Sequence, residues 1–343
     1  MRSMNEQEYR NAEGVSRSLL SDFDDHPMNV KEPREAVESD AFRIGSAFDA
    51  LMFQSADEWN ERYYVATENP PTGMMEGMVK AAIDIRLTDP FFSISEEDLA
   101  EQAFAASEYK DSYKKTALKQ FEGFSGYIQE RVENYGKVCL SQSEYDMLLR
   151  MSINCISDSY VMKFFVQNTH PDYELKFQVP VFWQQSGVTC KALLDIVLVD
   201  HAEKKIYPVD LKTTSSSVYH FASSFIKYKY YLQASMYTAA IEELFVNEIS
   251  EGYTVENFKF IVVGTNGRND VLTYTVSDED LQAGDYGYTD LYGNYHRGWI
   301  TLLEDLSWHY EHDLWKHPRN VYAHQNDMPL NCTAPWRQQL QLQ

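Results

Sequence analysis

The chain has 343 residues, of which 44% are hydrophobic and 14% aromatic, and its formal net charge is -22 at pH 7. This length and composition predict a well-packed globular protein, either a large single domain or a core domain with insertions, and they exclude a disordered chain. A charge of -22 disfavours non-selective binding of polyanions, because the summed field repels them; any nucleic-acid contact needs a local basic patch or divalent cations.

The expected elements change character along the chain. Residues 15–27 and 41–54 predict two short helices, residues 68–73 (ENPPTG) a loop, and residues 74–165 a mostly helical region with breaks near 88–90 and 136. Three strands follow over 174–183, 188–200 and 204–213, and then one long helix over 221–245. Strands over 258–264 and 270–276 and a helix over 296–315 complete the pattern.

This order predicts an α/β (α+β) fold in which a mixed central sheet is flanked by helices. We expect a mostly helical N-terminal region over residues 1–165, which includes the helix over 41–54. The core is expected over 166–317 and an irregular tail over 318–343, all within one compact domain.

The sequence also narrows the setting of the protein. No run of about 18 apolar residues occurs, and the first residues, MRSMNEQEYRNAEG, lack the apolar stretch of a secretory signal. We therefore expect a cytoplasmic protein that does not contact a membrane. The cysteines lie far apart without a CxxC pair, which disfavours a zinc ribbon and a disulfide framework; they are Cys139, Cys155, Cys190 and Cys332.

Three ionisable residues interrupt the apolar strands of the segment CKALLDIVLVDHAEKKIYPVDLKTTSSS, residues 190–217. Asp195 lies in the first strand, and Asp210 and Lys212 lie two residues apart in the next, so both point to one face. A tight connection would bring the two carboxylates together, where they repel unless a cation neutralises both. Oxygen ligands of this kind suit Mg²⁺ or Mn²⁺ better than zinc. The alternative is an exposed ion pair at a strand end, with Asp195 in a turn.

This segment resembles the PD-(D/E)xK nuclease superfamily, and most closely its RecE-like (exonuclease VIII) and RecB-type branch. In that branch a D-x-K-T-T motif is followed by a helix that carries Q-x3-Y. Here DLKTT is followed by Gln233 and Tyr237 in YYLQASMY, one helical turn apart. The resemblance implies a restriction-endonuclease-like core in which Asp195 and Asp210 bind metal and Lys212 orients and activates the attacking water. Gln233 and Tyr237 would then hold the lysine or the DNA backbone.

The branch also has an upstream G-x3-H-x-L helix whose histidine reaches the metal. This sequence has Gly45, Asp49 and Leu51 at those positions, so an aspartate replaces the histidine. Asp49 is either a third carboxylate ligand, which we favour, or part of a purely structural helix. The backbone carbonyl of Leu211 is a further ligand by analogy, and Glu174 is another candidate that could equally be an exposed residue at a strand start.

Further implications of the resemblance concern cofactors and DNA contacts. Some relatives carry an iron–sulfur cluster with three closely spaced cysteines near the C-terminus, whereas only Cys332 lies there, so no cluster is expected. Lysines beside aromatic side chains can contact phosphates and stack on unpaired bases. The expected DNA contacts are Thr213, Thr214, Lys227, Lys229 and Arg43.

The resemblance thus implies a Mg²⁺-dependent DNA exonuclease that hydrolyses phosphodiester bonds of linear DNA in phage-type or prophage-type recombination. It also implies that the protein works with a single-strand annealing protein and that it forms a homo-oligomeric ring. A structure-specific endonuclease, a nuclease subunit that needs a helicase, and a nucleic-acid-binding or scaffold protein without catalysis are the alternatives.

Overall fold

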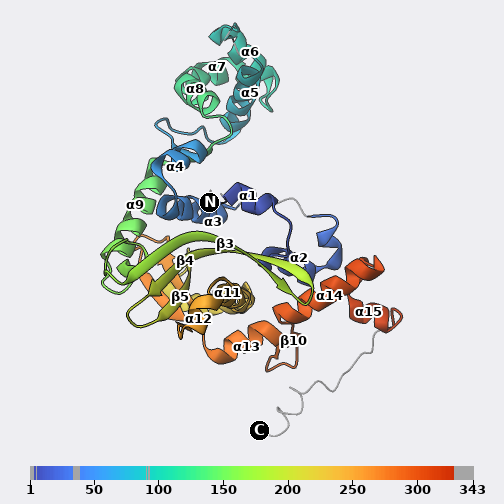
Figure 1. The fold of residues 1–343 in the computed structure, drawn as a ribbon. Coiled ribbons are helices and arrows are strands. Elements are labelled where there is room, and N and C mark those ends of the chain that lie inside the picture. Colours follow the sequence, from blue (N-terminus) through green and yellow to red (C-terminus); the bar gives the residue numbers. More distant parts are fainter. Residues whose placement is uncertain (1–3, 5, 34–38, 90, 92, 328–343) are drawn as a thin grey trace, which may run out of the picture. The chain divides into compact units, whose positions relative to one another are not determined.

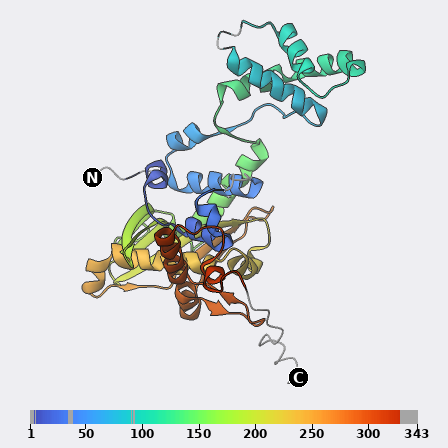
Figure 2. The same cartoon turned by 90° about the vertical axis from the view of Figure 1, so that its right-hand side faces the viewer.

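The computed structural model describes residues 4, 6–33, 39–89, 91 and 93–327. The chain divides into two compact units, one of Met1–Gly45 with Arg150–Gln343 and the other of Ser46–Leu149. The first unit holds a six-stranded sheet and the second is mainly helical (Figures 1 and 2). Helices α3 (Asp40–Phe53) and α9 (Gln142–Ser157) each contribute residues to both units. Within the described residues, no helix is long and apolar enough to cross a membrane.

The sheet of the first unit has the strand order β3-β4-β5-β7-β8. Strands β3 (Tyr173–Gln185), β4 (Val188–Asp200) and β5 (Lys205–Thr214) form an antiparallel meander. Strand β7 (Lys259–Gly264) runs parallel to β5, and β8 (Val271–Thr275) returns antiparallel to β7. The short strand β6 (Thr254–Val255) also pairs with β5. The predicted mixed sheet with flanking helices is therefore confirmed.

Helix α11 (Tyr230–Leu244) covers one face of this sheet, inside the curve of β3, β4 and β5 (Figure 1). Its apolar residues share one hydrophobic core with residues of these three strands, of α2 (Arg17–Asp25) and of α14 (Trp299–His312). A second cluster joins α10 (Phe221–Lys227) and α11 to β7. The helices thus fix the position of the first turn of α11 over β5, where the predicted acidic residues lie.

The predicted long helix over 221–245 is wrong at one point. It breaks into α10 and α11 at Lys229, which has a φ of 54°. Contacts with α2 account for the break, because Lys229 forms an ion pair with Asp24 and Arg17 donates a hydrogen bond to the carbonyl of Tyr228. These contacts join residues more than 200 positions apart, so local sequence carries no trace of them.

The remaining elements of the first unit lie around this core. They are α1 (Glu6–Asn11), 3-10 turns at Pro27–Val30, Met162–Phe164 and Val218–His220, α12 (Val246–Ser250), α13 (Asp278–Tyr286), β9 (Tyr288–Thr289), β10 (Tyr295–His296) and α15 (Arg319–Ala323). The tail predicted to be irregular thus contains α15 in its described part. Lys191 on β4 holds α1, because its buried ammonium donates hydrogen bonds to the carbonyls of Tyr9, Arg10 and Ala12.

The second unit contains α4 (Ala56–Arg62), α5 (Met74–Thr88), α6 (Glu96–Ala105), α7 (Lys114–Phe121) and α8 (Ser125–Glu133), with 3-10 turns at Asp111–Tyr113 and Glu122–Phe124. A parallel pair of short strands, β1 (Tyr63–Val65) and β2 (Val138–Leu140), accompanies them. Helices α5 to α8 share one apolar core.

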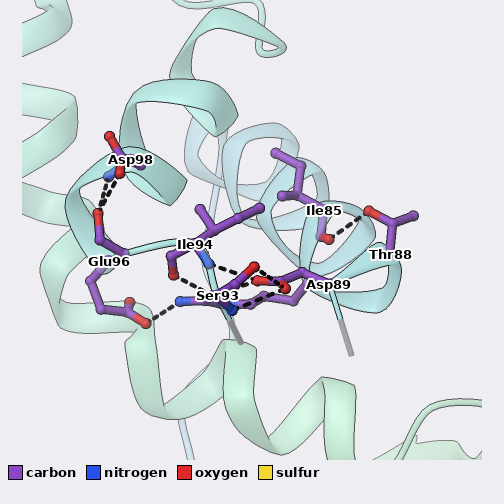
Figure 3. Close-up of polar contacts among 9 residues, drawn as sticks. Ile85, Thr88, Asp89, Ser93, Ile94, Glu96 and Asp98 are labelled. Atoms are coloured by element: carbon purple, nitrogen blue, oxygen red, sulfur yellow. Dashed lines mark hydrogen bonds and ion pairs between the residues drawn. The ribbon is translucent and has the colours of Figure 1, made fainter. Parts of the chain in front are cut away.

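A buried polar network fixes the connection between α5 and α6 (Figure 3). The carboxylate of Asp89 accepts hydrogen bonds from the backbone and hydroxyl of Ser93 and from the backbone N–H of Ile94. Arg86, which is 5% exposed, donates to the carbonyl of Ile94 at 2.7 Å and pairs with Asp89 and Glu96. These bonds satisfy charges that would otherwise oppose burial.

Candidate active site

Strands β4 and β5 part at the two aspartates. Their pairing runs from Asp200↔Lys205 to Ile196↔Val209 and then stops, one step before Asp195 and Asp210 would meet. From Val209 onward β5 pairs with β7 on its other edge. Asp195 Oδ2 accepts a hydrogen bond from the backbone N–H of Leu211 at 3.1 Å, so the carboxylate replaces the missing backbone acceptor. The side chain of Asp195 therefore lies in the gap between the strands.

The carbonyl of Leu211 faces the same gap. In a β-strand the N–H and C=O of one residue point to the same edge. Because the N–H of Leu211 points to Asp195, its carbonyl oxygen does as well. The predicted backbone ligand and the predicted carboxylate ligand therefore share one edge of β5.

Asp195 also marks a break in the alternation of β4. The core beneath α11 includes even-numbered residues before Asp195 (Cys190, Ala192 and Leu194) and odd-numbered residues after it (Val197 and Val199). The side chains of β4 that face this core therefore change from even to odd positions around Asp195. The simple period of two therefore does not define the face of Asp195 from the preceding residues.

Gln178 on β3 accompanies this break, and the sequence analysis did not single it out. Its φ is 48°, a left-handed conformation that is uncommon for a residue other than glycine. Its amide donates a hydrogen bond from Nε2 to Asp195 Oδ1 at 3.0 Å. A polar residue in the apolar stretch FQVPV was the available signal.

Asp210 lies deeper, with only 2% of its surface exposed. Gln233 in the first turn of α11 donates from Nε2 to Asp210 Oδ1 at 2.5 Å. Lys212 Nζ lies 2.5 Å from Asp210 Oδ2. The ammonium of Lys212 therefore faces Oδ2 directly, while Gln233 binds Oδ1. The structure thus brings together Asp195, Asp210, Lys212 and Gln233.

Electrostatics keep Lys212 charged in this arrangement. Burial opposes its charge, but the carboxylates of Asp210 and Asp195 outweigh that effect and raise the pKa of Lys212 above its ordinary value. Its Nζ also lies 5.2 Å from the ring centroid of Tyr230, a cation–π distance. The guanidinium of Arg17 lies 5.9 Å from the same ring. Tyr230 is one of the aromatic residues beside Lys227 and Lys229 in the sequence, whereas Arg17 was not identified from the sequence.

Tyr237 lies one turn after Gln233 on α11 and is partly buried between the two cores. Burial raises its pKa well above the ordinary value, and the charges of Tyr9, Asp210 and Asp195 add to the effect. The phenol is therefore neutral and close to the carboxylates. Its ring centroid is 6.3 Å from that of Phe258.

Glu174 is not brought to this cluster. It pairs with Val199 across β3 and β4, four residues from Asp195, which corresponds to about 13 Å along the strand. Its charge is satisfied by Lys176 and by His201, whose Nε2 lies 3.5 Å away. A role for Glu174 as a strand-end residue fits this position.

The predicted DNA contacts have different surroundings. Lys229 is paired with Asp24, and Arg43 with Asp40 at 3.2 Å, whereas Lys227 is exposed and lies over the ring of Tyr228. The hydroxyl of Thr214 accepts a hydrogen bond from the backbone of Ser216.

Gly45 explains one element of the upstream motif. A Cβ at Gly45 would lie 3.2 Å from the hydroxyl of Thr213, so the helix can approach β5 at this position only if the residue is small. Asp49 lies one turn later on α3 and belongs to the second unit. Its role as a metal ligand stays a prediction, as does the absence of a cluster near Cys332, which lies outside the described residues.

The donor set fits a hard divalent cation. Two carboxylates and a backbone carbonyl lie at the gap between β4 and β5. Carboxylate and carbonyl oxygens are the ligands that Mg²⁺ prefers. The described residues contain no group of three or more histidine, cysteine or acidic side chains suited to a metal, so protein oxygens alone do not make a closed cage. Mg²⁺ tolerates this, because it usually keeps several waters.

Comparison with known proteins finds a matching family and similar solved structures. The model of a family described as "PDDEXK-like domain of unknown function (DUF3799)" matches residues 16–297. Among solved structures, one described as a "Putative exonuclease" from Eubacterium rectale is similar at 12% identity and a TM-score of 0.35, covering 80% of this chain and 92% of its own. No curated protein matches.

Proposed function

The chain belongs to this PDDEXK-like domain family, and on that premise we propose that it is a Mg²⁺-dependent deoxyribonuclease, most closely an exonuclease of the RecE-like type. One observation carries the proposal. Asp210 is a nearly fully buried carboxylate with Lys212 at 2.5 Å and Asp195 on the adjacent strand, so two acids share one lysine. The formal charges of this cluster sum to a negative value, which a divalent cation would neutralise.

Asp195, Asp210 and the carbonyl of Leu211 would hold the cation. A divalent cation bound there would lower the pKa of a coordinated water molecule and would neutralise charge on the phosphate. Mn²⁺ has the same ligand preference and is the expected substitute. Asp49, at the position of the histidine in the resembling branch, is proposed as a further carboxylate ligand.

Lys212 would contact the scissile phosphate and orient the attacking water. Its ammonium is held by Asp210 and faces the Tyr230 ring, so it is positioned before substrate arrives. Positive charge at this position stabilises the negative charge that develops on phosphate oxygens during hydrolysis. The products expected for this class are a 3′-hydroxyl and a 5′-phosphate.

Gln233 would keep Asp210 in a fixed orientation, because its amide binds Oδ1 and leaves Oδ2 to Lys212 and the cation. Gln178 does the same for Asp195 from the opposite strand. Tyr237 would support the first turns of α11 near the carboxylates. These residues act through the ligands and are positioning residues.

Linear DNA is the proposed substrate, in recombination of the phage or prophage type. A single-strand annealing protein is the proposed partner, and a homo-oligomeric ring would let a basic channel coexist with an acidic exterior. A strictly monomeric protein in solution would count against the ring.

The experiment is degradation of linear 5′-labelled duplex DNA, with Mg²⁺ or with EDTA, beside a closed-circular control. Lys212→Ala is the test variant, and Lys205→Ala on the same strand is the matched control because Lys205 pairs with Glu256 instead. Mg²⁺-dependent loss of only the linear DNA, abolished by Lys212→Ala and kept by Lys205→Ala, is the expected result. Cleavage of the circle would indicate an endonuclease. No cleavage with any divalent metal would overturn the proposal for the isolated chain and favour a partner-dependent subunit or a binding protein.

A further inference from the structure

A second polar site lies at the edge of the sheet just beyond the catalytic residues. Strands β5 and β7 are parallel, so their carboxyl ends meet, with Thr214 opposite Gly264. The segment after β5 and the turn between β7 and β8 join there through a hydrogen bond from the N–H of Thr265 to the carbonyl of Thr214, 2.8 Å long. Between them lies a hollow of about 440 Å³. It is lined by Ser217, Tyr219, Asn266, Gly267, Arg268 and Asp270.

The turn that carries Arg268 is held rigidly. Asn269 is only 1% exposed, adopts a φ of 52°, and donates from Nδ2 to the carbonyl of Gly264 at 2.9 Å. Asn154 on α9 donates to the carbonyl of Asn269 at 2.8 Å. The N–H of Arg268 binds the side chain of Asn266. The backbone conformation is therefore fixed without a ligand, which lowers the entropy that binding would cost.

The side chains presented by this turn suit a nucleotide. Arg268 is exposed and forms no ion pair with any described residue, and the guanidinium fork matches phosphate oxygens. Tyr219 is 68% exposed, and an exposed aromatic ring is a surface on which a base can stack. Asp270 is the acidic residue of the lining, and Ser217 and Asn266 add neutral hydrogen-bonding groups.

The position of the hollow relates it to the catalytic lysine. Thr214 follows Lys212 by two residues on β5, about 7 Å along the strand, and the hollow begins beyond Thr214. Successive charges of one DNA strand in a duplex are roughly 3.4 Å apart along the axis. A strand with one phosphate at Lys212 would therefore place a phosphate that is two or more nucleotides away near Arg268.

We propose that this hollow binds the DNA strand a few nucleotides from the scissile phosphate, with a phosphate on Arg268 and an unpaired base on the ring of Tyr219. This inference rests on the proposed nuclease function and names its substrate more narrowly. The base that contacts Tyr219 is then unpaired, because a base stacked within a duplex does not offer its face to a protein ring.

The test measures binding of a fluorescein-labelled single strand of 12 nucleotides, and of a blunt duplex of the same sequence, to the full chain in EDTA over a range of salt concentrations. Arg268→Gln should lower the slope of log Kd against log salt by about 0.7 for the single strand, the value for one lost phosphate contact. Tyr219→Leu should weaken single-strand binding by about fivefold or more and leave the salt slope unchanged.

Matched controls separate these effects from general changes of charge and surface. Lys316→Gln removes one exposed positive charge elsewhere in the described chain, and Tyr292→Leu removes a ring that is 69% exposed; neither should change affinity or slope as much.

The outcomes distinguish the two proposals. The inference is overturned if Arg268→Gln binds the single strand with the affinity and salt slope of the wild type, or if it changes them no more than Lys316→Gln does. This holds even if the wild type cleaves DNA. Equal weakening of duplex and single strand by Tyr219→Leu would overturn the unpaired base. If the wild type cleaves nothing with any metal, the proposed function fails, and the binding slopes still decide whether the hollow holds a DNA strand.

Discussion

Replacing Lys212 with methionine tests the charge balance of the candidate site. Lys212 Nζ lies 2.5 Å from Asp210 Oδ2, and Asp210 is 2% exposed. At an effective dielectric constant of about 20 the gross attraction is about 7 kcal/mol. Much of it offsets the desolvation of the two groups, and removing one partner of a buried pair costs about 3–5 kcal/mol because the other charge is left uncompensated. We therefore expect Lys212→Met to lower the free energy of unfolding in EDTA by about 3–5 kcal/mol.

The companion variants make this expectation specific. Asp210→Asn should cost less, because the side chain of Lys212 is 20% exposed and retains Asp195 nearby. The double variant Asp210→Asn/Lys212→Met should recover most of the stability lost in Lys212→Met, since no uncompensated charge remains. A double-mutant cycle from urea unfolding of the metal-free proteins gives the coupling energy directly.

Mg²⁺ adds a second measurement on the same variants. A cation held by Asp195 and Asp210 binds the folded state and stabilises it by mass action. Mg²⁺ at roughly 10 mM should therefore raise the midpoint of urea unfolding of Lys212→Met. Asp210→Asn should lose this response. If Lys212→Met is as stable in EDTA as the double variant, Asp210 carries no uncompensated charge and the reasoning fails. A full Mg²⁺ response in Asp210→Asn would remove Asp210 from the ligands.

Three further predictions concern residues outside the site. Lys191→Met should destabilise the first unit by about 1–3 kcal/mol in urea unfolding, because buried backbone carbonyls lose their donor, and it should speed proteolysis within α1. His309 is fully buried, and burial lowers its pKa. Its neutral form therefore stabilises the fold above about pH 6.5, and this contribution is lost as the pH falls below that value. Between pH 7 and 5 the unfolding midpoint of His309→Gln should fall less than that of the wild type. Arg86→Met should destabilise the second unit, seen as earlier proteolysis between α5 and α6, because Asp89 and Glu96 lose their cation.

Each of these has an outcome that contradicts it. Unchanged proteolysis of α1 in Lys191→Met would show that the helix is held by other contacts. Parallel pH curves for His309→Gln and the wild type would assign the acid sensitivity to other groups. For Arg86, the control is Lys80→Met on the same helix, which takes no part in this network and should leave proteolysis unchanged. Equal effects of the two variants would contradict the prediction.

The meeting of the two aspartates was predictable because it depends on local features. The turn after Asp200 is short, and the antiparallel register that it sets carries Asp195 toward Asp210 without any distant contact. Gln233 followed from the resemblance, in which a Q-x3-Y helix comes after D-x-K-T-T, and the structure places it on Asp210. The aspartates needed only the short turn between two neighbouring strands, whereas Gln233 needed the family motif.

Long-range contacts account for what the sequence did not predict. Lys229 looked available for DNA because its neighbours in sequence are aromatic, yet its partner Asp24 lies on α2, and nothing local links the two. Glu174 heads β3 as predicted, but the register opposite β4 places it away from Asp195. Sequence spacing within one strand fixes neither the register of a pair nor the partner of a charge.

The irregular backbone around Asp195 has a different cause. A strand buried on both faces reads as a continuous apolar run, so the change of face in β4 leaves no mark in the pattern LLDIVLV. The change becomes necessary only because the carboxylate of Asp195 occupies the gap where β5 leaves β4 for β7, and because Gln178 turns into a left-handed conformation to reach it. Backbone strain of this kind persists where surrounding structure holds it and is concentrated at functional sites. Gln178→Gly, which removes both the strain and the amide, should therefore leave the strands paired while loosening Asp195.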